Sequence, residues 1–163
     1  MKWLASYICI YSLLLIIMIG CKGRHPFPDT PVLTFSGLSK DSLIQGFLNT
    51  DSIIVFFHFT DGDGDIGDLP GDTLLDLIVK DTRMQTEEYF KLPVVESTTS
   101  GPISVDGSVR IYNTCCIYED GTPPCTARPD IEEQSLQYEI RIRDQAGHVS
   151  NAILTPKIHL QCK

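Results

Sequence analysis

The chain has 163 residues, and its 21 acidic side chains outnumber its 13 Lys and Arg residues, so the formal net charge is −8 at pH 7. This negative charge, with no basic cluster anywhere in the sequence, excludes binding to the phosphate backbone of nucleic acids. Roughly 130 residues follow the apolar N-terminus, which is enough for one domain with its own hydrophobic core.

The first 20 residues have the features of a signal peptide. One cation, Lys2, precedes an apolar run from Ile8 to Ile19, which is shorter than the roughly 18 residues of a membrane-spanning helix. The segment "MIGC", Met18–Cys21, resembles the lipobox of bacterial lipoproteins, although Met18 replaces the usual Leu, Val or Ile. The resemblance implies cleavage before Cys21 and acylation of Cys21, which would tether the mature chain to a membrane. An ordinary secretory signal or an uncleaved anchor is the alternative.

Residues 21–31 are predicted to form a flexible tether. They contain Pro26, Pro28 and Pro31 and few apolar side chains, a composition typical of extended and poorly packed segments. An aspartate directly after the lipidated cysteine resembles the inner-membrane retention signal of the best-known lipoproteins, and this chain has Lys22 there. We therefore expect an outer-membrane lipoprotein, with the periplasmic and external faces both open.

Residues 32–163 are predicted to form a single all-β domain. Short apolar or alternating segments are separated by Gly, Pro, Asn and Asp, and only residues 82–92 are also compatible with a short helix. The clearest predicted strands are residues 52–59, which are apolar on both faces, residues 73–81, residues 107–118 and residues 135–144. Several short strands of this kind favour an antiparallel, immunoglobulin-like β-sandwich.

The segment "YEIRIRDQAGHVSNAI", residues 138–153, resembles the last hairpin of bacterial immunoglobulin-like and fibronectin-III-like domains. The matching residues are Tyr138, Ile140, Ile142, Asp144, Gly147 and Ser150, and His148 stands where Asn is usual. Together with "FTDGDGDIG", residues 59–67, this hairpin also resembles a group of uncharacterised bacterial lipoproteins. We expect Asp144 to bond to the turn backbone and Gly147 to take a positive φ, while a metal-ligand role for Asp144 is the alternative.

An acidic loop follows the apolar strand at residues 52–59. Its aspartates alternate with glycines, which allow the backbone to curl so that several carboxylates converge, and Ca²⁺ accepts such oxygen ligands. The predicted calcium ligands are Asp61, Asp63, Asp65, Asp68 and Asp72. An EF-hand is excluded because Ile66 occupies the sixth loop position, where that motif requires Gly. A solvated acidic turn without a metal is the alternative.

The cysteines provide a second constraint. Four of them lie in the predicted domain, and an even number in an exported protein favours two disulfides. Strand alternation places Cys115 and Cys162 inward and Cys116 and Cys125 outward. This favours Cys115–Cys162 and Cys116–Cys125 among the three possible connectivities. A zinc site that combines these cysteines with His58 or His159 has poor ligand spacing.

The sequence contains no recognisable nucleophile motif and no phosphate-binding loop, so we do not expect an enzyme. We expect a non-catalytic, calcium-stabilised lipoprotein that binds another envelope protein or an extracellular glycan. The only tryptophan, Trp3, lies in the leader, so the domain lacks the side chain best suited to a glycan platform. A structural subunit of an envelope complex, without a metal, is the alternative.

Overall fold

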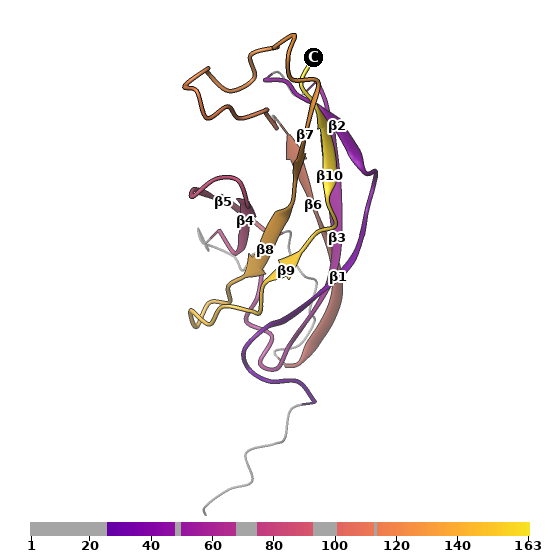
Figure 1. Ribbon diagram of the computed structural model, residues 1–163. Helices are drawn as coiled ribbons and strands as arrows, with labels where there is room; N and C mark the ends of the chain where they lie inside the picture. Colours follow the sequence, from indigo (N-terminus) through magenta and orange to yellow (C-terminus); the bar gives the residue numbers. More distant parts are fainter. Residues whose placement is uncertain (1–25, 48–49, 68–74, 93–100, 113) are drawn as a thin grey trace, which may run out of the picture.

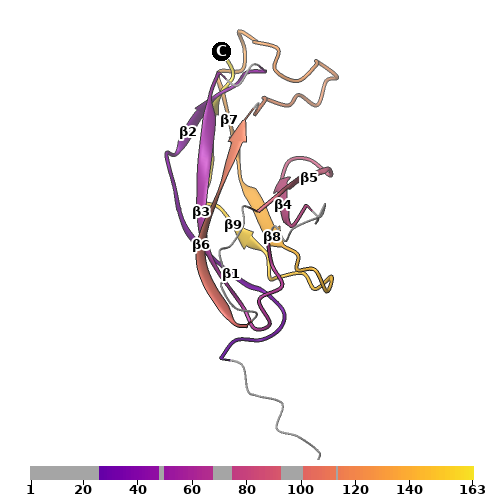
Figure 2. The ribbon, with the colours of Figure 1, turned by 180° about the vertical axis from the view of Figure 1, so that it is seen from behind.

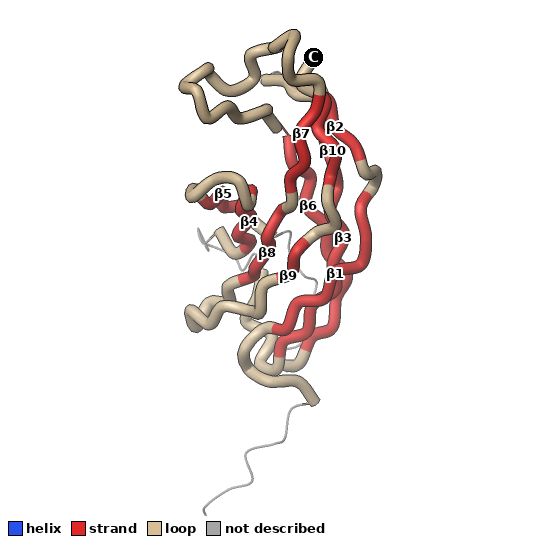
Figure 3. The backbone as a smooth tube through the Cα atoms, viewed as in Figure 1, coloured by secondary structure: helices blue, strands red, loops and turns tan. Residues whose placement is uncertain are grey.

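The computed structural model describes residues 26–47, 50–67, 75–92, 101–112 and 114–163. Within these ranges the chain forms strands and loops and no helix (Figure 3). The described residues therefore contain no helix long and apolar enough to span a membrane. The ten strands are β1 (Val32–Leu38), β2 (Ser42–Ile44), β3 (Ser52–Asp61), β4 (Leu77–Asp81), β5 (Glu87–Phe90), β6 (Ile103–Tyr112), β7 (Glu133–Leu136), β8 (Tyr138–Ile142), β9 (Ile153–Leu154) and β10 (Ile158–Gln161). The all-β prediction is confirmed, and β5 lies where a short helix was the other possibility.

The strands form three hydrogen-bonded sheets. Their orders are β1-β3-β6, β5-β4-β8-β9 and β2-β10-β7. Figures 1 and 2 show β4 and β5 standing opposite β1 and β3, and side chains from both sides belong to one hydrophobic core. All of the strand pairs are antiparallel except β2 with β10, which is parallel. The antiparallel prediction is therefore corrected at this one pair, where the three-residue β2 joins the C-terminal strand.

Strand β3 shows how the sequence determines the buried face. Ile53, Val55, Phe57 and Phe59 alternate along the strand and all point into the core, because successive side chains of a strand lie on opposite faces. On the other face, Phe56 is 40 % exposed. The segment that is apolar on both faces is a strand, as predicted, and β3 is central in its sheet, but only one of its faces meets the opposite sheet.

The turn after β8 has the predicted local chemistry. The backbone N–H of His148 donates to Asp144 Oδ1 at 2.7 Å, and Gly147 has φ of 92°. The backbone N–H of Ile142 donates to the Ser150 hydroxyl at 3.0 Å, which closes the hairpin on its other arm. Both expectations for Asp144 and Gly147 are confirmed, because a short carboxylate and a residue without Cβ are what such a turn requires.

Two disulfides are present, as expected, but the predicted pairing is wrong. Cys115 is bonded to Cys125, and Cys116 to Cys162, with Cα–Cα distances of 4.6 and 5.8 Å. The prediction extended the alternation of β6 to the cysteines, yet β6 ends at Tyr112. Beyond the strand end the inward side chain is Cys116, which is fully buried with Cys162, while Cys115 and Cys125 are partly exposed.

Candidate metal centre

Asp61 is the last residue of β3, and its side chain is 0 % exposed. Its Oδ2 accepts a hydrogen bond from the backbone N–H of Gly64 at 2.8 Å. Its Oδ1 is buried and has no hydrogen-bond donor among the described residues. A buried carboxylate oxygen without a partner is costly, so this atom requires either a proton or a cation.

Asp65 lies four residues further along the same loop and is held by the turn after β8. Its Oδ2 accepts from the backbone N–H of Ala146 at 3.0 Å, and its carbonyl oxygen accepts from the N–H of Gln145 at 3.2 Å. Its Oδ1 is a second buried carboxylate oxygen for which the described part of the chain offers no hydrogen-bond donor.

Asp144 provides the third carboxylate, from the turn that follows β8. Its side chain is fully buried, and besides the N–H of His148 it contacts the imidazole, with Nδ1 2.8 Å from Oδ2. Asp61, Asp65 and Asp144 each offer one oxygen, and these oxygens all lie within 4.8 Å of one another. Three buried or half-buried carboxylates therefore converge from the ends of β3 and β8, which belong to different sheets.

The predicted ligands separate into three groups. Asp61 and Asp65 come together, as the Asp-Gly repeat suggests. Asp63 is exposed and lies outside the convergent group. Asp68 and Asp72 fall outside the described residues, as do the predicted signal peptide and Cys21. Asp144, considered above mainly as a turn residue, completes the group, and no signal within the acidic loop itself identifies it.

The electrostatics follow from this crowding. Burial, followed by the neighbouring Asp63 carboxyl, raises the pKa of Asp61 to about 7. Burial and the charges of Asp144 and Asp63 raise the pKa of Asp65 as well. The hydrogen bond from Asp144 raises the pKa of the His148 imidazole. Without a cation, the site is therefore a cluster of carboxylates that oppose one another's ionisation.

Glycines give the loop its shape. Gly64 has φ of 72°, and a Cβ atom at this position would overlap the carbonyl oxygen of Gly101. A Cβ atom on Gly62 would lie 2.6 Å from the carbonyl oxygen of Phe27. The tight curl that brings Asp61 and Asp65 together thus depends on both glycines, and the end of the predicted tether packs against the loop.

We expect the metal-free protein to lose stability between about pH 4 and pH 7, in part through Asp61. The pKa of Asp61 is raised from its ordinary value of 3.8, which applies to the unfolded chain, to about 7 in the folded protein. Between these two values the folded state binds a proton that the unfolded state has released. The stabilisation is present at low pH and is lost as the pH rises through about 7. In buffer stripped of metals, thermal melts of Asp61→Asn should show a smaller decrease than the wild type. Glu119 is an exposed carboxylate, so the control variant Glu119→Gln should behave as the wild type. Equal decreases in the wild type and in Asp61→Asn would contradict the raised pKa of Asp61.

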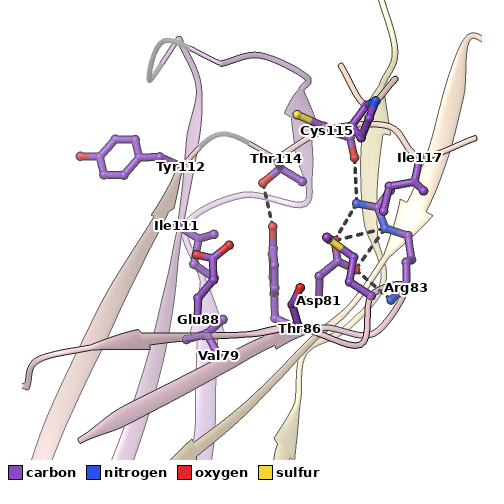
Figure 4. A pocket seen from close by; sticks show the side chains of 13 residues that line it. Val79, Asp81, Arg83, Thr86, Glu88, Ile111, Tyr112, Thr114, Cys115 and Ile117 are labelled. Carbon is purple, nitrogen blue, oxygen red and sulfur yellow. Dashed lines mark hydrogen bonds and ion pairs between the residues drawn. The ribbon is translucent and has the colours of Figure 1, made fainter. Parts of the chain in front are cut away.

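A cavity of about 190 Å³ lies elsewhere, between the turn after β4 and the segment that follows β6 (Figure 4). Arg83 forms an ion pair with Asp81 at 2.7 Å and donates to the carbonyl oxygen of Cys115 at 2.9 Å. It also donates to the side-chain oxygen of Gln134 at 3.0 Å. Through these contacts Arg83 connects the β4 turn to the disulfide loop.

One group on the outer face of β3 and β6 has the connectivity of a Ser-His-Asp triad. His58 contacts Asp106 at 2.8 Å through Nδ1 and Ser104 at 3.0 Å through Nε2. Asp106 is exposed, however, and the N–H groups of a strand lie in the plane of the sheet, where they cannot stabilise an oxyanion above it. We interpret this group as a cross-strand surface network.

The chain matches no protein-family model, and no curated protein or solved structure is similar to it at a significant level. The functional interpretation therefore depends on the chemistry of the described residues, above all on the three convergent carboxylates.

Proposed function

We propose that this protein is a membrane-anchored envelope lipoprotein whose immunoglobulin-like β-sandwich is stabilised by Ca²⁺ and acts as a non-catalytic binding or accessory module. The observation that carries the proposal is the group of Asp61, Asp65 and Asp144, with buried, unpartnered oxygens on the first two. A hard cation satisfies those oxygens and offsets the repulsion between the carboxylates.

The type of ligand set favours Ca²⁺ over Mg²⁺. One oxygen from each of the three aspartates lies within 4.8 Å of the other two, so the carboxylates converge on one place that a single hard cation can bridge. Mg²⁺ demands a nearly ideal octahedron and keeps several of its waters, whereas Ca²⁺ tolerates irregular ligand geometry. Ca²⁺ also accepts backbone carbonyls and water, which an irregular loop supplies readily.

The strand order supports an immunoglobulin-like arrangement. In the order of that fold, β1, β3 and β6 correspond to the A-B-E sheet, and β4, β8 and β9 to the C-F-G sheet, with β5 added beside β4. The parallel pairing of β2 with β10 joins the first part of the chain to the last strand. The antiparallel pairing of β8 with β9 also supports this arrangement.

The two ends of the molecule suggest different roles. In Figures 1 and 2 the first described residues, the loop after β3 and the turn after β8 lie toward one end. The connection between β6 and β7 lies at the other. A lipid on Cys21 would place the acidic site near the membrane, because the backbone of Phe27 and Pro28 packs against Gly62. The opposite end would then face a partner. Ile44 and Phe47 are exposed in and after β2 near that end, which favours contact with another envelope protein.

We expect several millimolar CaCl₂ to raise the melting temperature of the full-length protein by very roughly 5–15 °C over chelator at constant ionic strength. A ligand that binds only the folded state contributes about 2.7 kcal/mol at a hundredfold excess over its Kd. Asp61→Asn should lose most of the increase, and the exposed Glu119→Gln should keep it. Equal melting temperatures of the wild type in calcium and in chelator would leave the loop as an acidic turn without a metal.

A further inference from the structure

We propose that Asp144 ligates the same cation as Asp61 and Asp65, so that Ca²⁺ acts as a clasp between two sheets rather than as the ligand of one acidic loop. The inference rests on the proposed calcium binding and extends it. It assigns a ligand that lies outside the Asp-Gly repeat, and it gives the ion the specific role of fastening the loop at residues 61–67 to the turn at residues 143–149.

The three carboxylates come from strands of two different sheets. Asp61 ends β3 in the β1-β3-β6 sheet, and Asp144 follows β8 in the β5-β4-β8-β9 sheet. Their oxygens nevertheless lie within 4.8 Å of one another and of Asp65. A single ion among them is therefore bonded to both sheets.

The unpartnered Oδ1 of Asp61 indicates that this position takes a proton or a cation. This side chain is 0 % exposed, so surface water does not reach it, and Oδ1 has no hydrogen-bond donor among the described residues. A proton shared with a neighbouring carboxylate, or a cation, satisfies such an oxygen. Near neutral pH a cation satisfies this oxygen better than a proton does, because it also offsets the repulsion from the Asp65 and Asp144 carboxylates.

Hydrogen bonds from neighbouring groups hold each of the three carboxylates in place. The N–H of Gly64 holds Asp61, the N–H of Ala146 holds Asp65, and the N–H and imidazole of His148 hold Asp144. Each carboxylate oxygen accepts more than one bond, so these contacts leave lone pairs for an ion. Such supporting bonds orient the ligands of metal sites generally.

The clasp has a structural consequence. The direct bonds between the loop and the turn are few: Asp65 accepts from Gln145 and Ala146, and the Gln145 side chain donates to the Gly67 carbonyl at 3.4 Å. The three carboxylates oppose these bonds by charge repulsion. With calcium bound, we expect the loop and the turn to become ordered together, so that calcium determines whether this end of the two sheets is closed.

Calcium titration of the full-length protein by calorimetry, with paired variants, tests the clasp. Asp144→Asn keeps an oxygen for the His148 N–H and removes the charge, and it should raise the calcium Kd at least tenfold. Asp63→Asn is the matched comparison, since it removes the same charge from an exposed residue beside the site, and it should raise the Kd by a clearly smaller factor than Asp144→Asn does. Wild-type affinity in Asp144→Asn, with calcium still bound, would overturn the clasp and leave the proposed function standing. No calcium binding by the wild type would overturn both.

Hydrogen exchange on the wild type gives a second test that does not depend on a variant folding. Calcium should slow amide exchange at least tenfold both in residues 61–67 and in residues 143–150. The amides of β10, which belongs to the β2-β10-β7 sheet and lies away from the loop after β3 in Figure 1, should be unaffected. Slowing confined to residues 61–67 would show that the ion belongs to the acidic loop alone and would overturn the clasp.

Discussion

Replacing Cys116 and Cys162 together by alanine should lower the free energy of unfolding by about 4 kcal/mol. The bond joins residues separated by 46 positions, and a cross-link stabilises chiefly by restricting the unfolded chain, more so for a longer loop. Both sulfurs are fully buried at the end of the core, so their removal also leaves unfilled space. Urea denaturation of the double variant, compared with the wild type, measures the loss.

The second disulfide supplies the matched comparison. Cys115 and Cys125 are separated by only 10 positions and are partly exposed, so their double replacement by alanine should cost about 2.7 kcal/mol or less. Peptide mapping without reduction should join Cys116 to Cys162. A Cys115–Cys162 peptide, or an equal loss in the two double variants, would contradict the connectivity.

Phe57→Ala should cost about 3–5 kcal/mol, the usual range for emptying the site of a buried phenylalanine. The ring is fully buried from the middle of β3 and lies over Gly107 of β6, where a Cβ atom would come within 2.4 Å of it. Gly107 has no side chain with which to fill the space that the ring would leave. Urea denaturation at constant calcium concentration measures the loss.

Phe56→Ala removes the same side chain from the neighbouring position and is the control. Phe56 points away from the core and is 40 % exposed, so we expect a loss of about 1 kcal/mol or less. The difference between the two variants tests the register of β3 directly. Equal losses, or a larger loss at Phe56, would mean that the opposite face of the strand is buried.

The local features of the fold were predictable because each depends on neighbouring residues. Tyr138, Ile140 and Ile142 alternate with polar residues, and the structure buries those three side chains as the period of a strand requires. The turn at Asp144 and Gly147 follows from the backbone chemistry of those two residue types. The three-residue β2 was not predictable in the same way, since it is defined by its parallel partner β10 and not by its own short sequence.

The candidate site was predictable only in part, for a related reason. Asp61 and Asp65 belong to one repeat, so their convergence follows from glycine flexibility within a single loop. Asp144 comes from the other sheet, and its approach depends on how the two sheets pack, which no local pattern encodes. The prediction of the disulfide pairing was wrong for a similar reason. The alternation of side chains holds within β6, but beyond Tyr112 the path of the backbone, and not the period of a strand, places Cys116 inward.

A crystal structure of the protein grown with calcium, measured at a wavelength where calcium scatters anomalously, tests the central claim most directly. We expect one anomalous peak at roughly 2.3–2.6 Å from oxygens of Asp61, Asp65 and Asp144, with backbone carbonyls or water completing the shell. Asp63 should remain outside that shell or reach it only through water. A peak ligated by Asp63 without Asp144, or no peak at millimolar calcium, would contradict a cation shared between the two sheets.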